Sequence, residues 1–405
     1  MTKEGQSRNG LSSRRQVTTM FSLSLMIALV LTITIRAQAQ TFEVLYKFLQ
    51  PSDGNAPYAP LTRDAAGNLF GITINGGNSS GPCQPHGCGV VFRLSPTGKE
   101  AIYSFTGGTT DGAHPMGSMV LDSVGNLYGT TNEGGSFGQG IVFKINKSGK
   151  ETVLYNFAGG TADGCNPEGG LLQDGEGNLV GTTSACGTAD YGNVFKLTKQ
   201  GVETVLHNFL GPPSDAGYPY LTNLFRDKQG NLYGVTYHGG QSDRGALYEL
   251  SANGTVSLLY SFTNGTDGGF PAGDIARDEN GNFYGTTEDG GSFGAGTVWK
   301  VSPSGDETVL HSFENVPDGA LPLGGVVRDG SGNLYGVTNG GGVNNQGMVF
   351  KVDISGQETV LHNFSAKTDG AFPIGNVIGD AKCGCLYGTT FGSIVYDNGT
   401  VWVIK

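Results

Sequence analysis

The sequence predicts an all-β fold in which seven repeated units, each with four antiparallel strands, close into a ring. Three observations predict it: a recurring motif, turn-separated strands within each repeat, and chain ends that complement each other. The motif spacing of 51 to 58 residues is typical of an array or a closed ring. The motif is Gly-Asn-Leu-Tyr-Gly or a variant, and it begins at Gly67, Gly125, Gly177, Gly230, Gly281, Gly332 and Gly384.

The second repeat illustrates the four segments of each unit. A tight turn, which Asp122 opens and Gly125 closes, separates its first two strands, and a similar turn separates the last two. Gly129 lies within the second strand, where a glycine indicates close approach of a neighbouring backbone. The predicted strands are 115–121, 126–131, 140–145 and 151–157.

The two ends of the chain supply complementary parts of one unit. Residues 41–48 match a fourth strand, whereas the chain ends with a third strand at 400–404. Pairing of these two strands would close the ring and remove the exposed sheet edges of an open array. The sequence therefore predicts a single seven-bladed β-propeller over residues 40–405. Its predicted blades are 57–106, 115–157, 167–209, 219–262, 271–313, 322–364, and 373–404 plus 41–48.

Residues 1–39 have the composition of a secretory signal peptide. Basic residues such as Arg14 and Arg15 precede a 16-residue apolar run, and Ala37-Gln38-Ala39 supplies a cleavage site. The apolar run is shorter than the ~20 residues that span a bilayer. We therefore expect export to the periplasm, the cell surface or the medium, with no membrane span after cleavage.

Charge and motifs restrict the classes of function. Beyond residue 39 the chain has 19 basic and 34 acidic residues, which argues against nucleic acid or an anionic membrane as the main partner. Cations, neutral glycans and basic proteins remain open. The sequence contains no phosphate loop, Gly-x-Ser-x-Gly or His-Glu-x-x-His motif. We expect a monomer that needs no cofactor, with calcium as the metal left open.

Export also makes disulfides possible. Cys83 and Cys88 bracket a short insertion, and Cys165 and Cys186 belong to one repeat. Both pairs are disulfide candidates. Cys383 and Cys385 lie too close in sequence for an ordinary unstrained bridge, so the state of this pair stays open.

A loop of the form Asp-Gly-x-x-Pro precedes each innermost strand, and its aspartates are expected to ring one mouth of the central channel. They could hold a cation such as Ca²⁺, or they could form seven Asx-type turns that cap loop N–H groups. The turn interpretation is favoured because calcium needs several oxygen ligands converging on one point, whereas each blade has one aspartate. The aspartates are Asp53, Asp111, Asp163, Asp215, Asp267, Asp318 and Asp369.

Function is expected where the repeats differ. The residue before the loop Pro differs between blades, and it includes Tyr218, Phe270 and Phe372, which could stack on a sugar. Loop packing is the alternative interpretation of these rings. The full series is Ala56, His114, Asn166, Tyr218, Phe270, Leu321 and Phe372.

Other blade-specific residues decorate the same loop-rich face or the channel. His86 lies inside the Cys83–Cys88 loop, and Tyr237 and His238 belong to the fourth repeat. Tyr237 and His86 are binding candidates, whereas His114 and His238 could act in acid–base chemistry. One aligned column could line the channel and includes a further binding candidate, Asp274, beside Ser118, Asn223 and Asn376.

The repeated string resembles a known family. Asp-x-x-Gly-Asn-Leu-Tyr-Gly-Thr-Thr, then Gly-Gly, Val-Phe-Lys, Glu-Thr-Val-Leu-His-x-Phe and Asp-Gly-x-x-Pro, is similar to the GloVer tandem repeat of exported bacterial "choice-of-anchor" proteins. The resemblance covers residues 41–405. It implies an exported β-propeller and supplies no catalytic residues. Many members carry a C-terminal sorting anchor, whereas this chain stops at Lys405, one residue past its last predicted strand.

Two functional hypotheses follow. The favoured one is a non-enzymatic propeller that binds an extracellular glycan or protein on its loop-rich face. The alternative is an extracellular hydrolase or lyase that acts on a polysaccharide at the channel mouth with His114, His238 and channel carboxylates. An enzyme needs a few polar groups that converge in a pocket, whereas a binding protein needs an exposed aromatic or polar patch.

Overall fold

The computed structural model describes residues 40–79, 81–392 and 398–405. The unit Phe42–Lys405 forms the fold. Within its described residues, the one helical segment is the short 3-10 turn η1 (Pro51–Asp53). The predicted signal peptide, 1–39, lies outside the described residues. The described part of the chain contains no helix with the length and apolar character to cross a bilayer.

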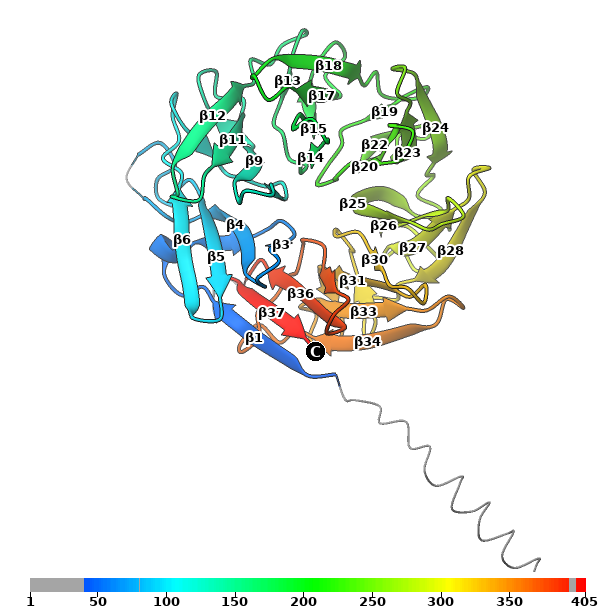
Figure 1. The fold of residues 1–405 in the computed structure, drawn as a ribbon. Helices are drawn as coiled ribbons and strands as arrows, with labels where there is room; N and C mark the ends of the chain where they lie inside the picture. The colour runs from blue at the N-terminus through cyan, green and yellow to red at the C-terminus, as the bar shows by residue number, and fades with distance from the viewer. Residues whose placement is uncertain (1–39, 80, 393–397) are drawn as a thin grey trace, which may run out of the picture. The chain divides into compact units, whose positions relative to one another are not determined.

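Residues 42–405 form a ring of seven antiparallel sheets, which confirms the predicted seven-bladed β-propeller (Figure 1). The second and third strands of each blade pair over five residues of each strand. The second strands are β4 (Leu69–Asn75), β9 (Leu127–Thr131), β15 (Leu179–Thr183), β21 (Leu232–Thr236), β26 (Phe283–Asp289), β31 (Leu334–Thr338) and β36 (Cys385–Thr390). The third strands are β5 (Val90–Ser95), β11 (Ile141–Ile145), β17 (Asn193–Leu197), β23 (Ala246–Leu250), β27 (Thr297–Val301), β33 (Met348–Val352) and β37 (Thr400–Ile404).

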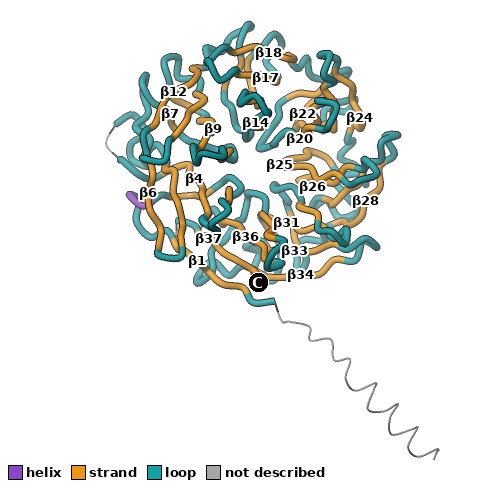
Figure 2. The backbone as a smooth tube through the Cα atoms, in the orientation of Figure 1, coloured by secondary structure: helices purple, strands orange, loops and turns teal. Residues whose placement is uncertain are grey.

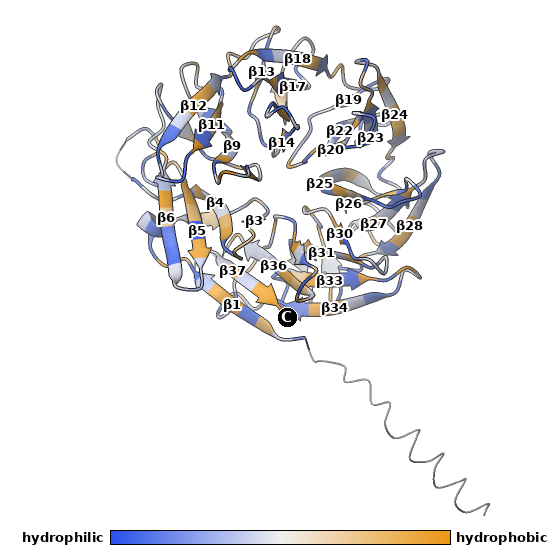
Figure 3. Ribbon diagram, viewed as in Figure 1, coloured by the Kyte–Doolittle hydropathy of each residue, from blue (hydrophilic) through white to orange (hydrophobic). Residues whose placement is uncertain are grey.

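The outermost strands lie on the circumference of the ring, and hydrophobic and hydrophilic residues both occur along them (Figures 1 and 3). In blade order they are β6 (Gly98–Ser104), β12 (Glu151–Asn156), β18 (Glu203–Asn208), β24 (Val256–Ser261), β28 (Glu307–Ser312), β34 (Glu358–Asn363) and β1 (Phe42–Lys47). The N-terminal strand β1 completes blade 7 by pairing with β37, from Phe42 opposite Ile404 to Lys47 opposite Thr400. The predicted ring closure is therefore confirmed.

The innermost strands are shorter than predicted in most blades. In blade 2 only Val120–Leu121 pairs with β9, whereas the sequence predicts a strand from Pro115. Pro115 has no N–H to donate, and Gly117 packs directly against the backbone of Gly169 in the next blade. The innermost strands are β3 (Thr62–Arg63), β8 (Val120–Leu121), β14 (Leu172–Gln173), β20 (Phe225–Arg226), β25 (Gly269–Arg277), β30 (Val327–Arg328) and β35 (Ile378–Asp380).

Short paired segments hold the loops of the loop-rich face, and Figure 2 shows the loops in teal between the orange strands of each blade. In four blades the Asp-Gly loop pairs with the segment that follows the second strand, and in blade 1 β2 (Asn55–Pro57) pairs with the end of β4. These pairs anchor the loops to the blades beneath them. The four pairs are β7 (Gly112–Ala113) with β10 (Glu133–Gly134), β13 (Gly164–Cys165) with β16 (Ala185–Cys186), β19 (Ala216–Gly217) with β22 (His238–Gly239), and β29 (Gly319–Ala320) with β32 (Gly340–Gly341).

Neighbouring blades share one aromatic contact that repeats seven times. The Phe that follows each outer strand packs against the aromatic residue of the third strand in the next blade, with ring centroids 5.1 to 5.9 Å apart. All fourteen rings are fully buried. The pairs are Phe48–Phe92, Phe105–Phe143, Phe157–Phe195, Phe209–Tyr248, Phe262–Trp299, Phe313–Phe350 and Phe364–Trp402.

The motif glycine of the second strand makes room for these rings. Gly285 lies directly opposite Trp299, and a Cβ atom at Gly285 would lie 2.4 Å from the Trp299 Cζ2 atom. Gly129 has the same relation to Phe143, at 2.6 Å. The prediction that Gly129 accommodates a neighbouring backbone is therefore wrong, because an aromatic side chain of its own blade takes that space.

Candidate functional site

The aspartate that opens each motif turn has a structural role. Asp122 Oδ1 accepts hydrogen bonds from the backbone N–H groups of Val124 and Asn126, and Oδ2 accepts from Asn126 Nδ2 and the Tyr128 hydroxyl. Partial burial raises the pKa of Asp122, but these hydrogen bonds outweigh it and hold the pKa below its usual value. Equivalent turns form at Asp64, Asp174, Asp227, Asp278 and Asp329.

The aspartates of the Asp-Gly-x-x-Pro loops lie beside the outer strands, so their predicted place at the channel mouth is wrong. Asp111 Oδ2 accepts from the Tyr103 hydroxyl of β6 and from Thr106 N–H, and Oδ1 accepts from Gly112 N–H. The carboxylate caps the loop where the chain leaves the circumference, before the loop turns inward. The aspartate and outer-strand pairs are Asp53–Tyr46, Asp111–Tyr103, Asp163–Tyr155, Asp215–His207, Asp267–Tyr260, Asp318–His311 and Asp369–His362.

These seven aspartates do not converge on one metal centre. Among the residues that the structure describes, no group of three or more His, Cys, Asp or Glu side chains could hold a metal ion. Each aspartate instead bonds to groups around its own loop. A single calcium site built from the whole series is therefore not available in this geometry.

The residue before each loop Pro adopts a left-handed backbone conformation in all seven blades. At Tyr218, φ is 57°; its N–H donates to Tyr191 O of the preceding blade, and its carbonyl accepts from Tyr237 N–H. Left-handed backbone favours glycine, yet none of the seven residues is glycine in a chain with 70 glycines. The φ values are 61° at Ala56, 54° at His114, 54° at Asn166, 57° at Tyr218, 58° at Phe270, 56° at Leu321 and 55° at Phe372.

Five of the rings on the loop-rich face come together between blades 4 and 5, and we call this group the aromatic patch. Tyr237 lies at its centre, with ring centroids 4.9 Å from Phe270, 5.3 Å from His238, 5.6 Å from Tyr220 and 6.4 Å from Tyr218. All five side chains are half-buried, so part of each ring faces solvent. The positions come from the loop before blade 4, the end of β21 and the loop before blade 5.

Charged groups border the aromatic patch. The Tyr237 hydroxyl donates to Glu288 Oε2 at 2.7 Å, and burial together with this carboxylate raises the pKa of Tyr237. The Arg244 guanidinium lies over the Phe270 ring at 5.0 Å, and His238 Nδ1 lies 3.4 Å from an Asp243 carboxylate oxygen. The patch thus combines flat apolar faces with hydrogen-bonding groups at their edges.

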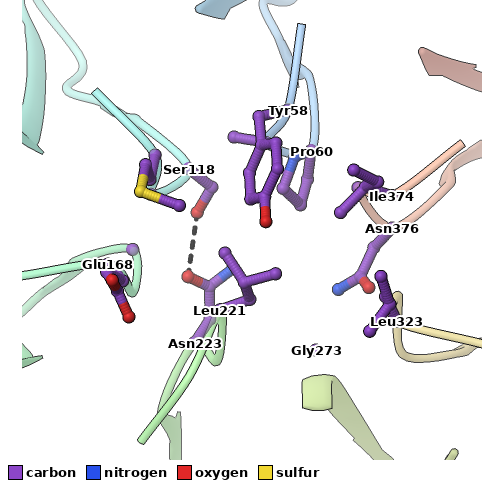
Figure 4. Close-up of a pocket in the computed structure, with 15 residues that line it drawn as sticks. Tyr58, Pro60, Ser118, Glu168, Leu221, Asn223, Gly273, Leu323, Ile374 and Asn376 are labelled. Carbon is purple, nitrogen blue, oxygen red and sulfur yellow. Dashed lines mark hydrogen bonds between the residues drawn. The ribbon is translucent and has the colours of Figure 1, made fainter. Parts of the chain in front are cut away.

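Residues of all seven blades line a small cavity in the central channel. Blade 4 has one more residue than the other blades between the loop Pro and the turn Asp. Within this longer segment Leu221 adopts a φ of 53° and lines the cavity (Figure 4). The Tyr220 and Tyr58 hydroxyls meet at 2.8 Å, although they belong to blades 4 and 1. The cavity left beside them is about 10 Å³, about enough for one water molecule.

The aligned polar column lies at this level, as the sequence suggested. Ser118 Oγ donates to Asn223 Oδ1 at 3.0 Å, and Ser118, Asn223 and Asn376 line the cavity (Figure 4). Asp274 lies in the wall, where it accepts from Asn223 N–H and Asn223 Nδ2, both at 2.9 Å. Burial raises the pKa of Asp274 despite these hydrogen bonds.

Sequence reasoning did not single out Glu168, Tyr220 or Glu288. Glu168 lines the channel cavity and is 8% exposed, and its buried Oε2 atom has no hydrogen-bond partner. Burial raises the pKa of Glu168 to about 7, against a hydrogen bond from Ser184. Comparison of the repeats could have found Glu168, because it is the one carboxylate among the seven residues that follow the loop Pro.

The other candidate residues lie apart from the aromatic patch. His114 belongs to blade 2, where Nδ1 lies 3.2 Å from Ile74 O and Nε2 lies 3.9 Å from Glu133 Oε2. His86 is exposed on the disulfide loop of blade 1. Phe372 belongs to blade 7. The structure therefore brings Tyr218, Tyr237, His238 and Phe270 together and leaves His86, His114, Phe372 and Asp274 elsewhere.

The structure contains both candidate disulfides. Cys83–Cys88 closes a loop in blade 1, and Cys83 lines the same surface pocket as His114. Cys165–Cys186 joins β13 to β16. It also joins Cys383 to Cys385, the pair whose state the sequence left open. All six cysteines are thus paired.

Comparison with known proteins identifies the repeat. Two structures of the extracellular domain of BT4673 from B. thetaiotaomicron match with TM-scores of 0.54 and 0.56 at 14% and 15% identity, which shows likeness of fold. Each match covers 90% of this chain and 42% of the extracellular domain, so the chain spans about two fifths of the length of that domain. No curated protein matches. The model of the Gloeobacter/Verrucomicrobia repeat matches residues 30–195 and 166–402, and the chain therefore belongs to the Gloeobacter/Verrucomicrobia repeat family.

Proposed function

We propose that this protein is an exported, non-enzymatic binding propeller whose aromatic patch holds an extracellular glycan. One observation carries the proposal: five rings from positions where the repeats differ gather in one place and are bordered by charged groups. Blades 7 and 1 also have aromatic residues at three of these positions, Phe372, Phe391 and Tyr58, and the ring centroids of Tyr58 and Phe391 lie 6.1 Å apart. The protein would act as a monomer, because the closed ring leaves no unpaired strand between its first and last blades.

The chemistry of the patch suits a sugar. The C–H faces of a sugar ring are apolar and pack on flat aromatic rings, while its hydroxyls need donors and acceptors at the edge. Tyr237 and Phe270 provide the ring faces. Glu288, Asp243 and Arg244 provide acceptors and a bidentate donor within the same patch.

The left-handed residues add a second argument. Bulky residues in this conformation cost about 1–3 kcal/mol each compared with relaxed backbone, and such strain often marks binding sites. Tyr218 and Phe270 both carry this cost and both contribute rings to the patch. Their side chains are retained where glycine would be the least strained choice.

The enzymatic alternative has less support. A hydrolase or lyase at the channel mouth needs polar groups that converge around a substrate. Here His114 bonds to Ile74 of blade 1, whereas His238 lies beside Asp243 in blade 4. The channel cavity is about 10 Å³, which is too small for a sugar ring. Glu168 is positioned in that closed space rather than in a cleft.

A polysaccharide panel tests the proposal. The purified protein is run in affinity gels that contain neutral, amino and acidic polysaccharides, followed by calorimetry with oligosaccharides of any retained polymer. We expect retardation by at least one glycan, and loss of more than about ten-fold in affinity for Tyr237→Ala, because a central aromatic contact carries much of the binding energy.

Phe372→Ala is the matched control, since Phe372 has the same backbone conformation but lies in blade 7. It should bind as well as the unaltered protein. Retardation by no glycan would exclude a carbohydrate ligand, and chain shortening of a retained polymer would favour the enzymatic alternative.

A further inference from the structure

On the face that carries the motif turns, which we call the hairpin face, one position beside each gap between neighbouring blades varies. It directly precedes the turn aspartate and lies opposite the third residue of the motif, as Arg277 lies opposite Phe283 and Leu121 opposite Leu127. The seven residues are therefore structurally equivalent. In blade order they are Arg63, Leu121, Gln173, Arg226, Arg277, Arg328 and Gly379.

In three blades an arginine at this position reaches across the gap. The Arg277 guanidinium carbon lies 4.8 Å from the ring centres of both Tyr233 and Phe283. Arg277 Nη1 lies 3.8 Å from Oδ2 of Asp227, the turn aspartate of the blade before. Such a gap is thus a guanidinium site with aromatic rings and a carboxylate. The arrangement recurs as Arg63 with Asp380 and Tyr387 and, with a glutamate in place of the aspartate, as Arg328 with Glu279 and Tyr284.

The gap between blades 1 and 2 has similar walls but no arginine. Leu121 stands at the arginine position, while Asp64 and Phe70 supply the turn aspartate and the aromatic ring of the blade before. These three residues line a surface hollow of about 870 Å³, and Leu127, the equivalent of Phe283, lines it as well. The hollow therefore lies where a guanidinium packs in other blades.

Asp64 also lacks a partner that most turn aspartates have. Its carboxylate accepts hydrogen bonds from Asn68 N–H and Asn68 Nδ2, both at 2.8 Å. Phe70 has no hydroxyl to donate, whereas a tyrosine at this position donates to the turn aspartate in four other blades. These tyrosines are Tyr128, Tyr233, Tyr284 and Tyr335.

The basic side chains that line the hollow have contacts elsewhere. Arg63 reaches the turn aspartate of blade 7, and Arg93 bonds to Glu100 of its own strand pair. Lys147 lies against the motif glycine of its own blade. Among the turn aspartates of the described residues, Asp64 is therefore the one with neither a tyrosine donor nor an ion pair.

The remaining gaps differ from this one. Gln173 and Gly379 also leave an arginine position unfilled, but the turn aspartates of the blades before them accept from a tyrosine hydroxyl. Between blades 3 and 4 the equivalent Arg226 is exposed, and Lys196 lies 3.7 Å from the turn aspartate instead. Loss of the arginine and loss of the tyrosine hydroxyl thus coincide in the gap between blades 1 and 2.

We propose that this hollow binds an arginine side chain of a partner protein, with its guanidinium beside the Phe70 ring and against the Asp64 carboxylate. Arginine suits the site because its planar guanidinium stacks on an aromatic face and donates to a carboxylate at the same time. The hollow extends beyond one side chain, and its apolar wall of Leu121, Leu127 and Ile102 accommodates the segment that presents the arginine. The excess of acidic residues beyond residue 39 favours a basic partner.

This site is independent of glycan binding. It is built from the motif turns of the hairpin face, whereas the aromatic patch is built from the loops of the loop-rich face. The proposed function can therefore fail without affecting the arginine site, and the reverse also holds.

Peptide binding tests the proposal. The purified protein is titrated with a capped alanine peptide that has one central arginine, at concentrations up to about 10 mM, which reveals millimolar dissociation constants. Matched peptides carry lysine or citrulline, the uncharged analogue of arginine, at the centre. Saturation-transfer NMR detects binding, and calorimetry measures the affinity. We expect the arginine peptide to bind at least about ten-fold more tightly than either matched peptide.

Two variants assign the binding to the hollow. Leu121→Arg supplies the arginine that other blades have, so the gap is filled from within and the peptide affinity should fall at least about ten-fold. Asp64→Asn removes the charge but keeps a side-chain oxygen for the turn, and should weaken binding by a similar factor. Leu121→Arg tests the site even if Asp64→Asn does not fold, because four other blades carry arginine at this position.

Each variant has a matched control in the gap between blades 6 and 7. Gly379→Arg adds an arginine at the equivalent position, where a Cβ atom would meet no atom within 4 Å. Asp329→Asn makes the same change in a turn that has a tyrosine donor. Both controls should bind the arginine peptide as the unaltered protein does.

Four results would overturn the proposal. The first is no binding of the arginine peptide in this concentration range. The second is equal affinity for the citrulline peptide, which would leave only apolar contact. The third is unchanged affinity in either folded variant, Leu121→Arg or Asp64→Asn. The fourth is self-association in analytical ultracentrifugation that Leu121→Arg abolishes, because the arginine would then come from a second copy of this chain.

Discussion

The two faces of the ring differ in how closely the blades repeat one another. On the hairpin face the blades are close copies: the Asp122 turn and its equivalents make the same hydrogen bonds in six of them. On the loop-rich face blade 4 departs from the others, with one more residue between the loop Pro and the turn Asp and a cluster of rings around Tyr237. Repetition therefore builds the ring, and departures from repetition mark the candidate binding site.

The largest expected effect comes from breaking the repeated interior. Phe157→Ala removes a fully buried ring that packs on Phe195 across the junction between blades 2 and 3. We expect a loss of about 3–5 kcal/mol in the free energy of unfolding, measured by urea denaturation. Phe137→Ala, on the variable face at 59% exposure, should change it by less than about 0.5 kcal/mol. Equal losses for both variants would contradict the division between the faces.

The motif glycine should be the next most sensitive position. Gly285→Ala places a methyl group 2.4 Å from the Trp299 ring, and such overpacking costs about 1–3 kcal/mol. The matched variant is Gly175→Ala, whose new methyl group would meet no atom within 4 Å. Urea denaturation of the two variants measures the difference. A Gly285→Ala protein as stable as Gly175→Ala would remove the packing explanation for the motif.

The pH dependence of stability should separate the turn aspartates from the glutamates that begin outer strands. The pKa of the turn aspartates is lowered by folding, so their contribution is present above the ordinary aspartate pKa of 3.8 and is lost as the pH falls below it. Burial and a nearby aspartate raise the pKa of Glu151, Glu203 and Glu307 from 4.5 to about 7, so stability falls as the pH rises between these values.

We therefore expect greatest stability near pH 4 to 5, with a decline of about 1–2 kcal/mol towards neutral pH after allowing for solvent screening. Urea denaturation across this range measures the decline. Stability that instead rises steadily from pH 4 to 7 would contradict the raised pKa values of the glutamates.

The smallest effect concerns the left-handed position. Ala56→Gly relieves a conformation that costs an alanine about 1–2 kcal/mol, which offsets the extra flexibility of glycine in the unfolded chain. We expect a change within about 0.5 kcal/mol of zero. Ala101→Gly, in the extended strand β6, lacks that relief and should cost about 0.5–1 kcal/mol. Thermal unfolding of both variants makes the comparison, and a larger loss for Ala56→Gly would contradict it.

The fold was predictable because it is encoded many times over. Seven copies of the motif and two turns per copy led to the blade count. An unmatched fourth strand at the N-terminus and a missing fourth strand at the C-terminus led to the closure between 41–48 and 400–404. The length of the innermost strands was less predictable, because Gly117 packs on the backbone of a neighbouring blade. That contact depends on the geometry of the ring and not on local propensity.

The candidate site was only partly predictable. Tyr218, Tyr237, His238 and Phe270 stand at positions where the repeats differ, so comparison of the copies could nominate them. Their convergence depends on how loops of neighbouring blades pack together, which the spacing along the chain does not give. The loop aspartates were placed at the wrong radius, because sequence spacing gives their position along a blade but not their distance from the axis.

Strand β1 has a consequence for how the protein is made. Blade 7 takes its outer strand from Phe42 and its third strand from Ile404, so the last sheet can form only when both ends of the chain are present. Closing a loop of this length costs several kcal/mol more than closing a short hairpin. Until then β37 offers an open edge, at which two unfinished copies could exchange their first strands and become linked as a domain-swapped pair.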